Sequence, residues 1–355
     1  MSNETIAKLK VAVLGASGYA GAELVRVLLR HPKVQLVALG GESSAGKKLS
    51  AYYPALRGFD MAIEKLDAAS LKGRADLAFL CLPHVQSMAV GAPLVRAGIK
   101  VIDLSGDFRL RDPKDYERAY KHKHSETDLL KEAVYGLPEL HAAEIKKARL
   151  VANPGCYTTT SILGIAPLLK AGALKTSSVI IDAKSGVTGG GRKLSDAFQF
   201  VEVHDNFAAY SVGGTHRHIP EIEQELSLAA GSPVTVSFTP HLLPVSRGIF
   251  ATIYADLGEG VSHDEEALLG LYRSAYAGSP FVRIYGAGEL PTLRSVQGTN
   301  FCDIGLKLDV RMRRVIVISC TDNLGKGAAF QAVQNMNLMQ GFSESEGLDL
   351  SALTT

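Results

Sequence analysis

The sequence is poor in cysteine, nearly balanced in charge and free of long apolar runs. Its 355 residues include four cysteines, which lie far apart without a CxxC pair or a spacing typical of metal ligands. Neither a disulfide framework nor a zinc site is therefore expected, and a reducing compartment suits such a chain better. We predict a cytoplasmic protein that holds no metal.

The charge balance bears on the partners of the chain. The formal net charge is +2 and the basic residues are scattered, so we predict no nucleic-acid partner and no membrane-surface partner. No run approaches the roughly 18 apolar residues of a transmembrane helix. Residues 1–10 lack the apolar core of a signal peptide. With 46% hydrophobic residues, the chain is long enough for two globular domains.

Short apolar runs alternate with helical patterns in the first part of the chain. A valine-rich run is followed by a helical pattern over residues 22–30, and another helical pattern covers residues 85–97. The expected strands are residues 10–14, 34–39, 76–81, 100–104 and 150–152. This alternation predicts a doubly wound, parallel α/β sheet of the Rossmann type.

The expected strands in the second part of the chain are spaced differently. Its expected strands have longer and more varied connections, and they are residues 178–184, 234–239, 248–256 and 315–320. This pattern predicts a second, α+β domain with a mixed, largely antiparallel sheet. A final helix is expected over residues 325–339, and it can return to the first domain.

A glycine-rich turn joins the first expected strand to the first expected helix. Its spacing is GxxGxxG, which permits a tight turn and close approach of the backbone to phosphate at a helix N-terminus. The alternative is a glycine-rich turn without a ligand. We predict a dinucleotide site formed by Gly15, Ala16, Ser17, Gly18, Tyr19 and Gly21.

The end of the second expected strand bears on the choice of dinucleotide. Glu42 occupies the position at which an acidic residue that hydrogen-bonds the ribose 2′-hydroxyl is expected. Its carboxylate, if it faces inward, would repel a 2′-phosphate. Ser43 and Ser44 follow at once, with Lys47 and Lys48 close behind, and these groups suit that phosphate. NADP(H) is therefore the predicted cofactor, with Ser43 and Ser44 among its contacts.

Cys156 is the candidate nucleophile. It follows an expected strand and an Asn-Pro-Gly turn, and it precedes an apolar helical pattern over residues 161–169. A helix N-terminus lowers the pKa of a thiol, as a nucleophilic cysteine requires. A free cysteine is more commonly a small buried hydrophobe, and this reading suits Cys81, Cys302 and Cys320.

Two histidines provide the candidate base. His216 and His218 precede an expected helix that starts near Pro220, and in an extended loop they would point to one side and Arg217 to the other. We predict His218 as the base, with His216 or Arg217 touching the substrate, although a lone histidine is more often structural. Glu221 is expected to hold the catalytic ring in its tautomer.

Two further segments are candidate anion sites. Residues 185–192 follow an expected strand and combine four glycines with Arg192, so they predict a nest for phosphate or carboxylate that includes Ser185 and Gly186. A flexible hairpin loop is the alternative. Arg109 offers a second cation for the substrate, or it forms a structural salt bridge with Asp103 or Asp107.

Taken in order, these segments resemble a known family. The motifs are GASGYAG, SGDFR, ANPGCYTT, SGVTGGGR, GTHRHIPE, HLLPVSRG and NLGKGAA. Together they resemble the long type of N-acetyl-gamma-glutamyl-phosphate reductase of arginine biosynthesis and, more distantly, aspartate-semialdehyde dehydrogenase. The resemblance implies that Cys156 is acylated, that the glycine loop holds NADPH and that Asn323 contacts the nicotinamide carboxamide. It does not separate His216 from His218.

The resemblance also implies partners and a domain plan. An acyl-phosphate substrate, inorganic phosphate and a homo-oligomer, either dimer or tetramer, are expected. Residues 1–155 and 325–355 would bind the dinucleotide, and residues 156–324 would carry catalysis and oligomerisation. The alternatives are aspartate-semialdehyde dehydrogenase, N-acetyl-aminoadipyl-phosphate reductase, a non-catalytic NADP-sensing regulator and a cysteine hydrolase, in which the glycine loop has no role.

Overall fold

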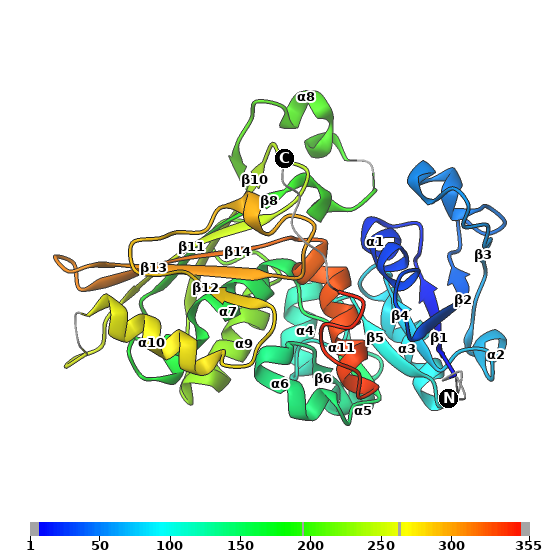
Figure 1. Ribbon diagram of the computed structural model, residues 1–355, viewed down its shortest axis with the longest axis horizontal. Helices are drawn as coiled ribbons and strands as arrows, with labels where there is room; N and C mark the ends of the chain where they lie inside the picture. The colour runs from blue at the N-terminus through cyan, green and yellow to red at the C-terminus, as the bar shows by residue number, and fades with distance from the viewer. Residues whose placement is uncertain (1–6, 194, 262–263, 349–355) are drawn as a thin grey trace, which may run out of the picture. The chain divides into compact units, whose positions relative to one another are not determined.

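A computed structural model describes residues 7–193, 195–261 and 264–348 (Figure 1). The chain divides into two compact units. The first contains residues 7–154 and 328–348, and the second contains the described part of residues 155–327. The outermost parts of the predicted first domain, residues 1–6 and 349–355, lie outside the described residues.

The first unit contains a sheet of seven parallel strands in the order β3-β2-β1-β4-β5-β7-β6. The predicted doubly wound parallel sheet is therefore confirmed. The strand order reverses between β1 and β4, and in such sheets ligands bind outside the carboxyl ends of the strands at this point. The strands are β1 (Leu9–Leu14), β2 (Val34–Gly40), β3 (Ile63–Glu64), β4 (Leu77–Leu80), β5 (Lys100–Asp103), β6 (Val134–Tyr135) and β7 (Leu150–Ala152).

Helices connect the strands of this unit. Local signals set several helix starts, as in α4, where the Asp112 carboxylate accepts the Lys114 N–H and Pro113 occupies the first turn. The helices are α1 (Tyr19–Leu28), α2 (Ala68–Leu71), α3 (Gln86–Arg96), α4 (Pro113–Tyr120), α5 (Thr127–Glu132), α6 (Pro138–Ile145) and α11 (Phe330–Met339), with 3-10 turns η1 (Leu49–Ala51) and η2 (Pro54–Leu56).

The second unit contains a mixed sheet of seven strands in the order β12-β13-β14-β11-β8-β10-β9. Neighbours pair antiparallel except β8 with β10 and β12 with β13, so the predicted mixed, largely antiparallel sheet is confirmed. The strands are β8 (Val179–Gly186), β9 (Ala208–Ala209), β10 (Val236–Leu243), β11 (Ile249–Asp256), β12 (Val282–Ile284), β13 (Cys302–Asp309) and β14 (Arg314–Thr321).

Helices α7 (Cys156–Lys170), α9 (Ile219–Ala230) and α10 (Glu265–Ala275) cover one face of this mixed sheet (Figure 1). Residues of β11 alternate strictly between buried and half-buried, because its side chains point alternately toward the helices and away from them. The second face of the sheet is therefore less covered than the first.

A segment with little regular structure joins β8 to α9. It contains the 3-10 turns η3 (Val187–Gly190) and η4 (Asp196–Phe198), the short helix α8 (Phe200–Val203) and the edge strand β9, and it lies at the top of Figure 1. Elsewhere in this unit lies the 3-10 turn η5 (Leu293–Ser295). The π-helical turn η6 (Gly325–Ala329) begins in this unit, ends in the first and continues into α11. In the part of the chain that is described, no helix is long and apolar enough to cross a membrane.

Candidate active site

Cys156 is the first residue of α7, with Gly155 as the N-cap in an extended conformation. Helix α7 begins five residues earlier than the sequence pattern indicates, so the thiol lies directly at the helix N-terminus. The positive end of a helix dipole favours a thiolate at such a position. Cys156 is half-buried, whereas Cys302 and Cys320 are buried, and burial raises the pKa of the Cys81 thiol to about 12. Of the four cysteines, Cys156 alone begins a helix, and its role as the nucleophile stays a prediction.

Glu221, on the first turn of α9, reaches the N-terminus of α7. Its Oε1 accepts the N–H of Gly155 at 2.9 Å and the hydroxyl of Thr158 at 2.8 Å, and the residue is buried. These hydrogen bonds satisfy donors at the start of α7 and fix the residue before the nucleophile. The role predicted from the sequence, orientation of a histidine ring, stays a prediction.

The two histidines meet in a turn that precedes α9. Their rings pack edge to face with centroids 4.8 Å apart. The backbone N–H of His218 donates to Nδ1 of the His216 ring at 3.2 Å. The segment is not extended, since His218 has φ −83° and ψ −10°. The expected alternation is therefore wrong, and Arg217 lines the same cavity as both histidines.

Burial sets the protonation state of His216. Loss of solvation, assisted by the nearby Arg217 charge, lowers the pKa of His216 to about 4, so the ring is neutral at pH 7. Tyr157 packs edge to face against both rings, with centroid distances of 5.7 Å to His216 and 6.2 Å to His218. The residue after the nucleophile thereby positions the two candidate bases.

A cavity of about 720 Å³ brings these groups together. Of the predicted anion nest, Ser185 and Gly186 line it, whereas Arg192 is exposed and does not. Gly186 is required sterically, because a Cβ there would lie 2.8 Å from the backbone nitrogen of Arg247. The residues that line the cavity are Cys156, Tyr157, Ser185, Gly186, Gly189, Gly190, Ala197, Phe198, Glu202, Val203, Asn206, Ala208, Ala209, Tyr210, Ser211, Thr215, His216, Arg217, His218 and Leu242.

The loop after β14 supports the nucleophile from behind. A Cβ on Gly327 would lie 2.8 Å from the Cβ of Cys156, so the two backbones are in close contact. The buried Asp322 carboxylate organises this loop. It accepts hydrogen bonds from the backbone N–H groups of Leu324 and Gly325, and it forms an ion pair with Arg247 at 3.0 Å. The sequence does not single out Asp322 or Arg247, although the motif HLLPVSRG contains Arg247. The resemblance implies that Gly325 and Gly327 let the backbone approach the nicotinamide, whereas the structure shows Gly327 against Cys156.

Asn323 has two defined partners in this loop. Its Oδ1 accepts the N–H of Gly248 at 2.7 Å, and its Nδ2 donates to the hydroxyl of Thr188 at 2.9 Å. The side chain therefore ties β11 to the glycine-rich segment after β8. A contact with the nicotinamide stays a prediction.

In the first unit, the glycine loop follows β1 at the switch point of the sheet. The N–H groups of Gly15 and Ala16 both donate to the carbonyl of Gly40. Gly15 has φ +82°, and a Cβ there would lie 2.2 Å from the carbonyl oxygen of Cys81. Gly18 is the N-cap of α1, so the first turn of that helix presents its N–H groups at the carboxyl end of the sheet. This loop has the form that dinucleotide phosphates require.

The end of β2 lies beside this loop. Ser44 is buried, and its hydroxyl lies 3.3 Å from that of Ser17, whereas Ser43 is exposed. Glu42 is also exposed and lies 3.7 Å from the ammonium of Lys65. The hydroxyl of Ser44 therefore lies next to that of Ser17 in the glycine loop.

Arg109 belongs to the first unit and is almost completely buried. Its guanidinium donates to the carbonyl oxygens of Asn153 and Leu104, each at 2.8 Å. The Asp103 carboxylate accepts bonds from Ser87 and Ser105, and that of Asp107 accepts the N–H groups of Val85 and Met88. Arg109 thus holds the carbonyl of Asn153, three residues before the nucleophile.

Comparisons with known proteins agree with this geometry. The family model described as "Semialdehyde dehydrogenase, NAD binding domain" matches residues 10–148, and "Semialdehyde dehydrogenase, dimerisation domain" matches residues 156–323. The N-acetyl-gamma-glutamyl-phosphate reductase of Symbiobacterium thermophilum is 52% identical over 341 residues, which cover 96% of this chain and 97% of that protein. That of Geobacter sp. (strain M21) is 51% identical over 343 residues, covering 96% and 98%. The chain belongs to the N-acetyl-gamma-glutamyl-phosphate reductase family.

Solved structures of the wider group share the fold. Aspartate semialdehyde dehydrogenase II of Vibrio cholerae matches with a TM-score of 0.70 at 18% identity, over 94% of this chain and 98% of that one. The aspartate semialdehyde dehydrogenase of Candida albicans, solved with NADP, matches with a TM-score of 0.71 at 16% identity, over 94% and 99%. The family and fold class predicted for this member of the N-acetyl-gamma-glutamyl-phosphate reductases are confirmed.

Proposed function

We propose that the chain reduces N-acetyl-gamma-glutamyl phosphate to N-acetylglutamate semialdehyde and inorganic phosphate, as a step of arginine biosynthesis. The observation that carries this proposal is the position of Cys156, at a helix N-terminus inside a cavity that is also lined by two histidines and by the glycine-rich segment after β8. The names of relatives about 50% identical over nearly the whole chain support the choice of substrate.

Acylation of Cys156 is the first step. The thiolate attacks the gamma-acyl carbon, a carbon–sulfur bond forms, and the bond to the phosphate oxygen breaks. Ser185 and Gly186 lie on the wall of the cavity. Because the N–H of Gly186 already donates to the carbonyl of Gly248, we assign the departing phosphate to the Ser185 hydroxyl rather than to a nest of backbone N–H groups. Arg217 lines the same wall and supplies positive charge toward the substrate. We assign Arg192 to binding of the substrate phosphate. We assign Arg109 to holding the backbone carbonyl of Asn153 in place before the nucleophile.

Reduction of the thioester completes the reaction. The nicotinamide, when bound, supplies the hydride. A histidine proton stabilises the oxygen of the resulting tetrahedral adduct, and that proton returns to the ring as the carbon–sulfur bond breaks and the semialdehyde leaves. We assign this proton to His218 rather than to His216. Nδ1 of His216 already accepts the backbone N–H of His218, and the low pKa of His216 keeps the His216 ring neutral. Glu221 keeps the start of α7 in place throughout.

NADP(H) is the proposed cofactor, held by the loop that contains Gly15, Gly18 and Gly21. The fit rests on that loop, where Gly15 has no room for a side chain and the first turn of α1 offers its N–H groups. The hydroxyls of Ser43 and Ser44 suit a 2′-phosphate, and Lys65 offsets the charge of Glu42. Asn323 is the proposed partner of the nicotinamide carboxamide.

The second unit is proposed to form a homodimer or tetramer, in line with the match to a dimerisation domain. We assign the enzyme to the cytoplasm. The substrate assignment is tested by phosphate-dependent reduction of NADP with three aldehydes, the semialdehydes of N-acetylglutamate, aspartate and N-acetyl-aminoadipate.

Preference for N-acetylglutamate semialdehyde is the expected result. Preference for either other aldehyde would keep the mechanism and overturn the substrate. Tight NADP binding without turnover of any aldehyde would instead indicate a nucleotide-sensing regulator.

A further inference from the structure

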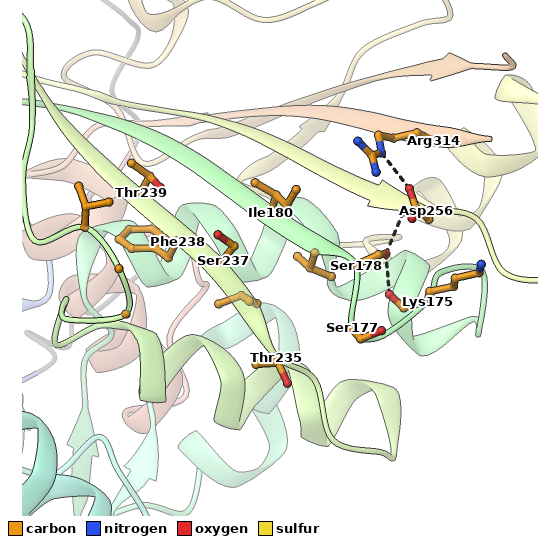
Figure 2. A pocket seen from close by; sticks show the side chains of 15 residues that line it. Lys175, Ser177, Ser178, Ile180, Thr235, Ser237, Phe238, Thr239, Asp256 and Arg314 are labelled. Carbon is orange, nitrogen blue, oxygen red and sulfur yellow. Dashed lines mark hydrogen bonds and ion pairs between the residues drawn. The ribbon is translucent and has the colours of Figure 1, made fainter. Parts of the chain in front are cut away.

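Helix α11 carries an unusual number of buried polar side chains. Four of its residues are polar and completely buried, namely Gln331, Gln334, Asn335 and Asn337. Polar side chains at a surface hydrogen-bond to water, as the exposed Thr235 and Ser237 can in the groove of about 760 Å³ that Figure 2 shows on the mixed sheet. Buried polar side chains need partners within the protein, and their hydrogen bonds therefore fix positions in the fold.

Asn335 reaches two segments at the carboxyl end of the parallel sheet. Its Nδ2 donates to the carbonyl of Gly136 at 2.8 Å and to Oδ1 of Asn153 at 3.0 Å. Gly136 follows β6, and Asn153 follows β7. The packing is tight, since a Cβ on Gly136 would lie 2.6 Å from Nδ2 of Asn335. Each proton of the carboxamide is thus used on the end of a different strand.

Asn153 is completely buried and is held at every one of its polar atoms. Its N–H donates to the carbonyl of Asp103 at 2.8 Å, and its own carbonyl accepts a bond from Nε of Arg109 at 2.8 Å. Its Nδ2 donates to the carbonyl of Ala328 at 3.2 Å, while its Oδ1 accepts the bond from Asn335. Asn335 therefore orients the carboxamide of a residue whose backbone is already fixed.

The chain from Asn153 to Cys156 is short and stiff. Pro154 has a fixed φ and no N–H, and the residue before a proline is restricted to extended conformations. Gly155 is extended as well, with φ −69° and ψ 153°, and its N–H is held by Glu221. A displacement of Asn153 is therefore passed along three peptide bonds to the first residue of α7.

We propose that Asn335 is a positioning residue for the Cys156 thiol and that it acts through Asn153. The inference rests on the proposed function for the role of Cys156 as the nucleophile. Without the Asn335 donor, the carboxamide of Asn153 is free to rotate, and the turn before α7 takes up more than one conformation. The thiol then spends less time in the geometry for attack, at the helix end where the dipole favours the thiolate.

Asn337 provides a matched control on the same helix. It is equally buried, and its Nδ2 donates to the carbonyls of Glu344 at 3.1 Å and Glu346 at 2.9 Å. Its Oδ1 lies 3.0 Å from Nε2 of His31, which precedes β2 at the amino end of the sheet. Residues two apart on a helix do not share a face. Truncation of Asn337 therefore removes comparable hydrogen bonds far from the turn before α7.

The test compares Asn335→Ala and Asn335→Leu with Asn337→Ala and Asn337→Leu. Alanine removes the donor and opens a cavity, whereas leucine removes the donor and fills the space, so a defect common to both belongs to the lost hydrogen bonds. We expect both Asn335 variants to lose kcat by about tenfold or more, because misplacement of a reacting group slows the chemical step. Their KM should stay within about twofold of wild type. The Asn337 variants should keep wild-type kcat, although all four variants should melt at lower temperature.

Alkylation of Cys156 by iodoacetamide gives a readout that does not depend on turnover. The pH profile of the alkylation rate should move to higher pH in both Asn335 variants, because a thiol displaced from a helix N-terminus ionises less readily. The profile of the Asn337 variants should match wild type. Mass spectrometry of the peptide that contains Cys156 identifies the alkylated residue. A chain that does not reduce an acyl phosphate would still show this shift, so failure of the proposed function is distinguishable from failure of this inference.

Two results would overturn the inference. Asn335 variants with wild-type kcat and a wild-type alkylation profile would show that the buried donor does not position the thiol. Equal defects in the Asn335 and Asn337 variants would assign the loss to general destabilisation of α11.

Discussion

The carboxylate of Glu221 accepts the N–H of Gly155 at 2.9 Å, across 66 residues of sequence. This contact joins the first turn of α9 to the residue before the nucleophile, and the same oxygen accepts the hydroxyl of Thr158. Because the histidine turn leads directly into α9, one buried carboxylate sets the positions of both the thiol and its candidate bases.

Replacing Glu221 should therefore cost both stability and activity. In Glu221→Ala, the Gly155 N–H loses its buried acceptor, whereas the Thr158 hydroxyl can still donate to the Gly155 carbonyl at 2.6 Å. The free energy of unfolding should therefore fall by about 1–3 kcal/mol. Glu221→Gln keeps an oxygen acceptor and should lose clearly less. Urea unfolding of the two variants checks this prediction. Equal losses for alanine and glutamine would show that the hydrogen bonds are not what the carboxylate contributes.

Gly327 tests how tightly the nucleophile is positioned. In Gly327→Ala, the new Cβ would meet the Cβ of Cys156 at 2.8 Å and displace it. Since displacements of about 1 Å at a reacting group can cost a hundredfold, we expect kcat to fall by about tenfold to a hundredfold.

The matched control is Gly270→Ala, on α10, where an added Cβ meets nothing within 4 Å. It should leave kcat unchanged and can raise stability, since alanine favours a helix. Steady-state kinetics of both variants, with NADP binding as a check of folding, make the comparison. A Gly327→Ala enzyme with wild-type kcat would contradict the close support of Cys156.

The low pKa of His216 predicts an acid-sensitive fold. Above pH 6.5 the ring is neutral in both the folded and the unfolded chain, so it adds no pH dependence. Between pH 6.5 and about 4 the unfolded chain binds the proton first, and the free energy of unfolding falls as the pH falls. His216→Gln should remove that part of the slope, whereas the exposed His204→Gln should not. Thermal unfolding from pH 4 to 8 measures both, and an unchanged slope in His216→Gln would contradict the assignment.

Much of the fold could be predicted because strong local signals agree with it. The strands of the first sheet are short and mostly apolar, and their alternation with helical patterns predicts the parallel topology. The sequence pattern does not predict strand β13, because Asp303 and Lys307 interrupt its apolar residues. Asp303 is fully buried there, and Arg283 pairs with it at 2.6 Å. A sequence does not show such a distant partner.

The sequence pattern also places the start of α7 too late. Three consecutive threonines follow Tyr157, and β-branched residues disfavour a helix. In the structure, the hydroxyls of Thr158 and Thr160 lie 2.6 and 3.0 Å from the carbonyl oxygens of Gly155 and Cys156, so both have an acceptor within the helix. Local motifs thus located Cys156 and the histidines. The support from Glu221, Asp322 and Gly327 depends on contacts between distant segments.

The central claim is that Cys156 carries the acyl group, and trapping that group tests it most directly. The enzyme is mixed with N-acetyl-gamma-glutamyl phosphate without any nicotinamide, phosphate release is followed rapidly, and the peptide that contains Cys156 is examined by mass spectrometry. We predict a stoichiometric burst of phosphate and an acyl group on Cys156, both absent in Cys156→Ala. Phosphate release only when NADPH is present, an acyl group on another residue, or a burst that survives in Cys156→Ala would contradict the account.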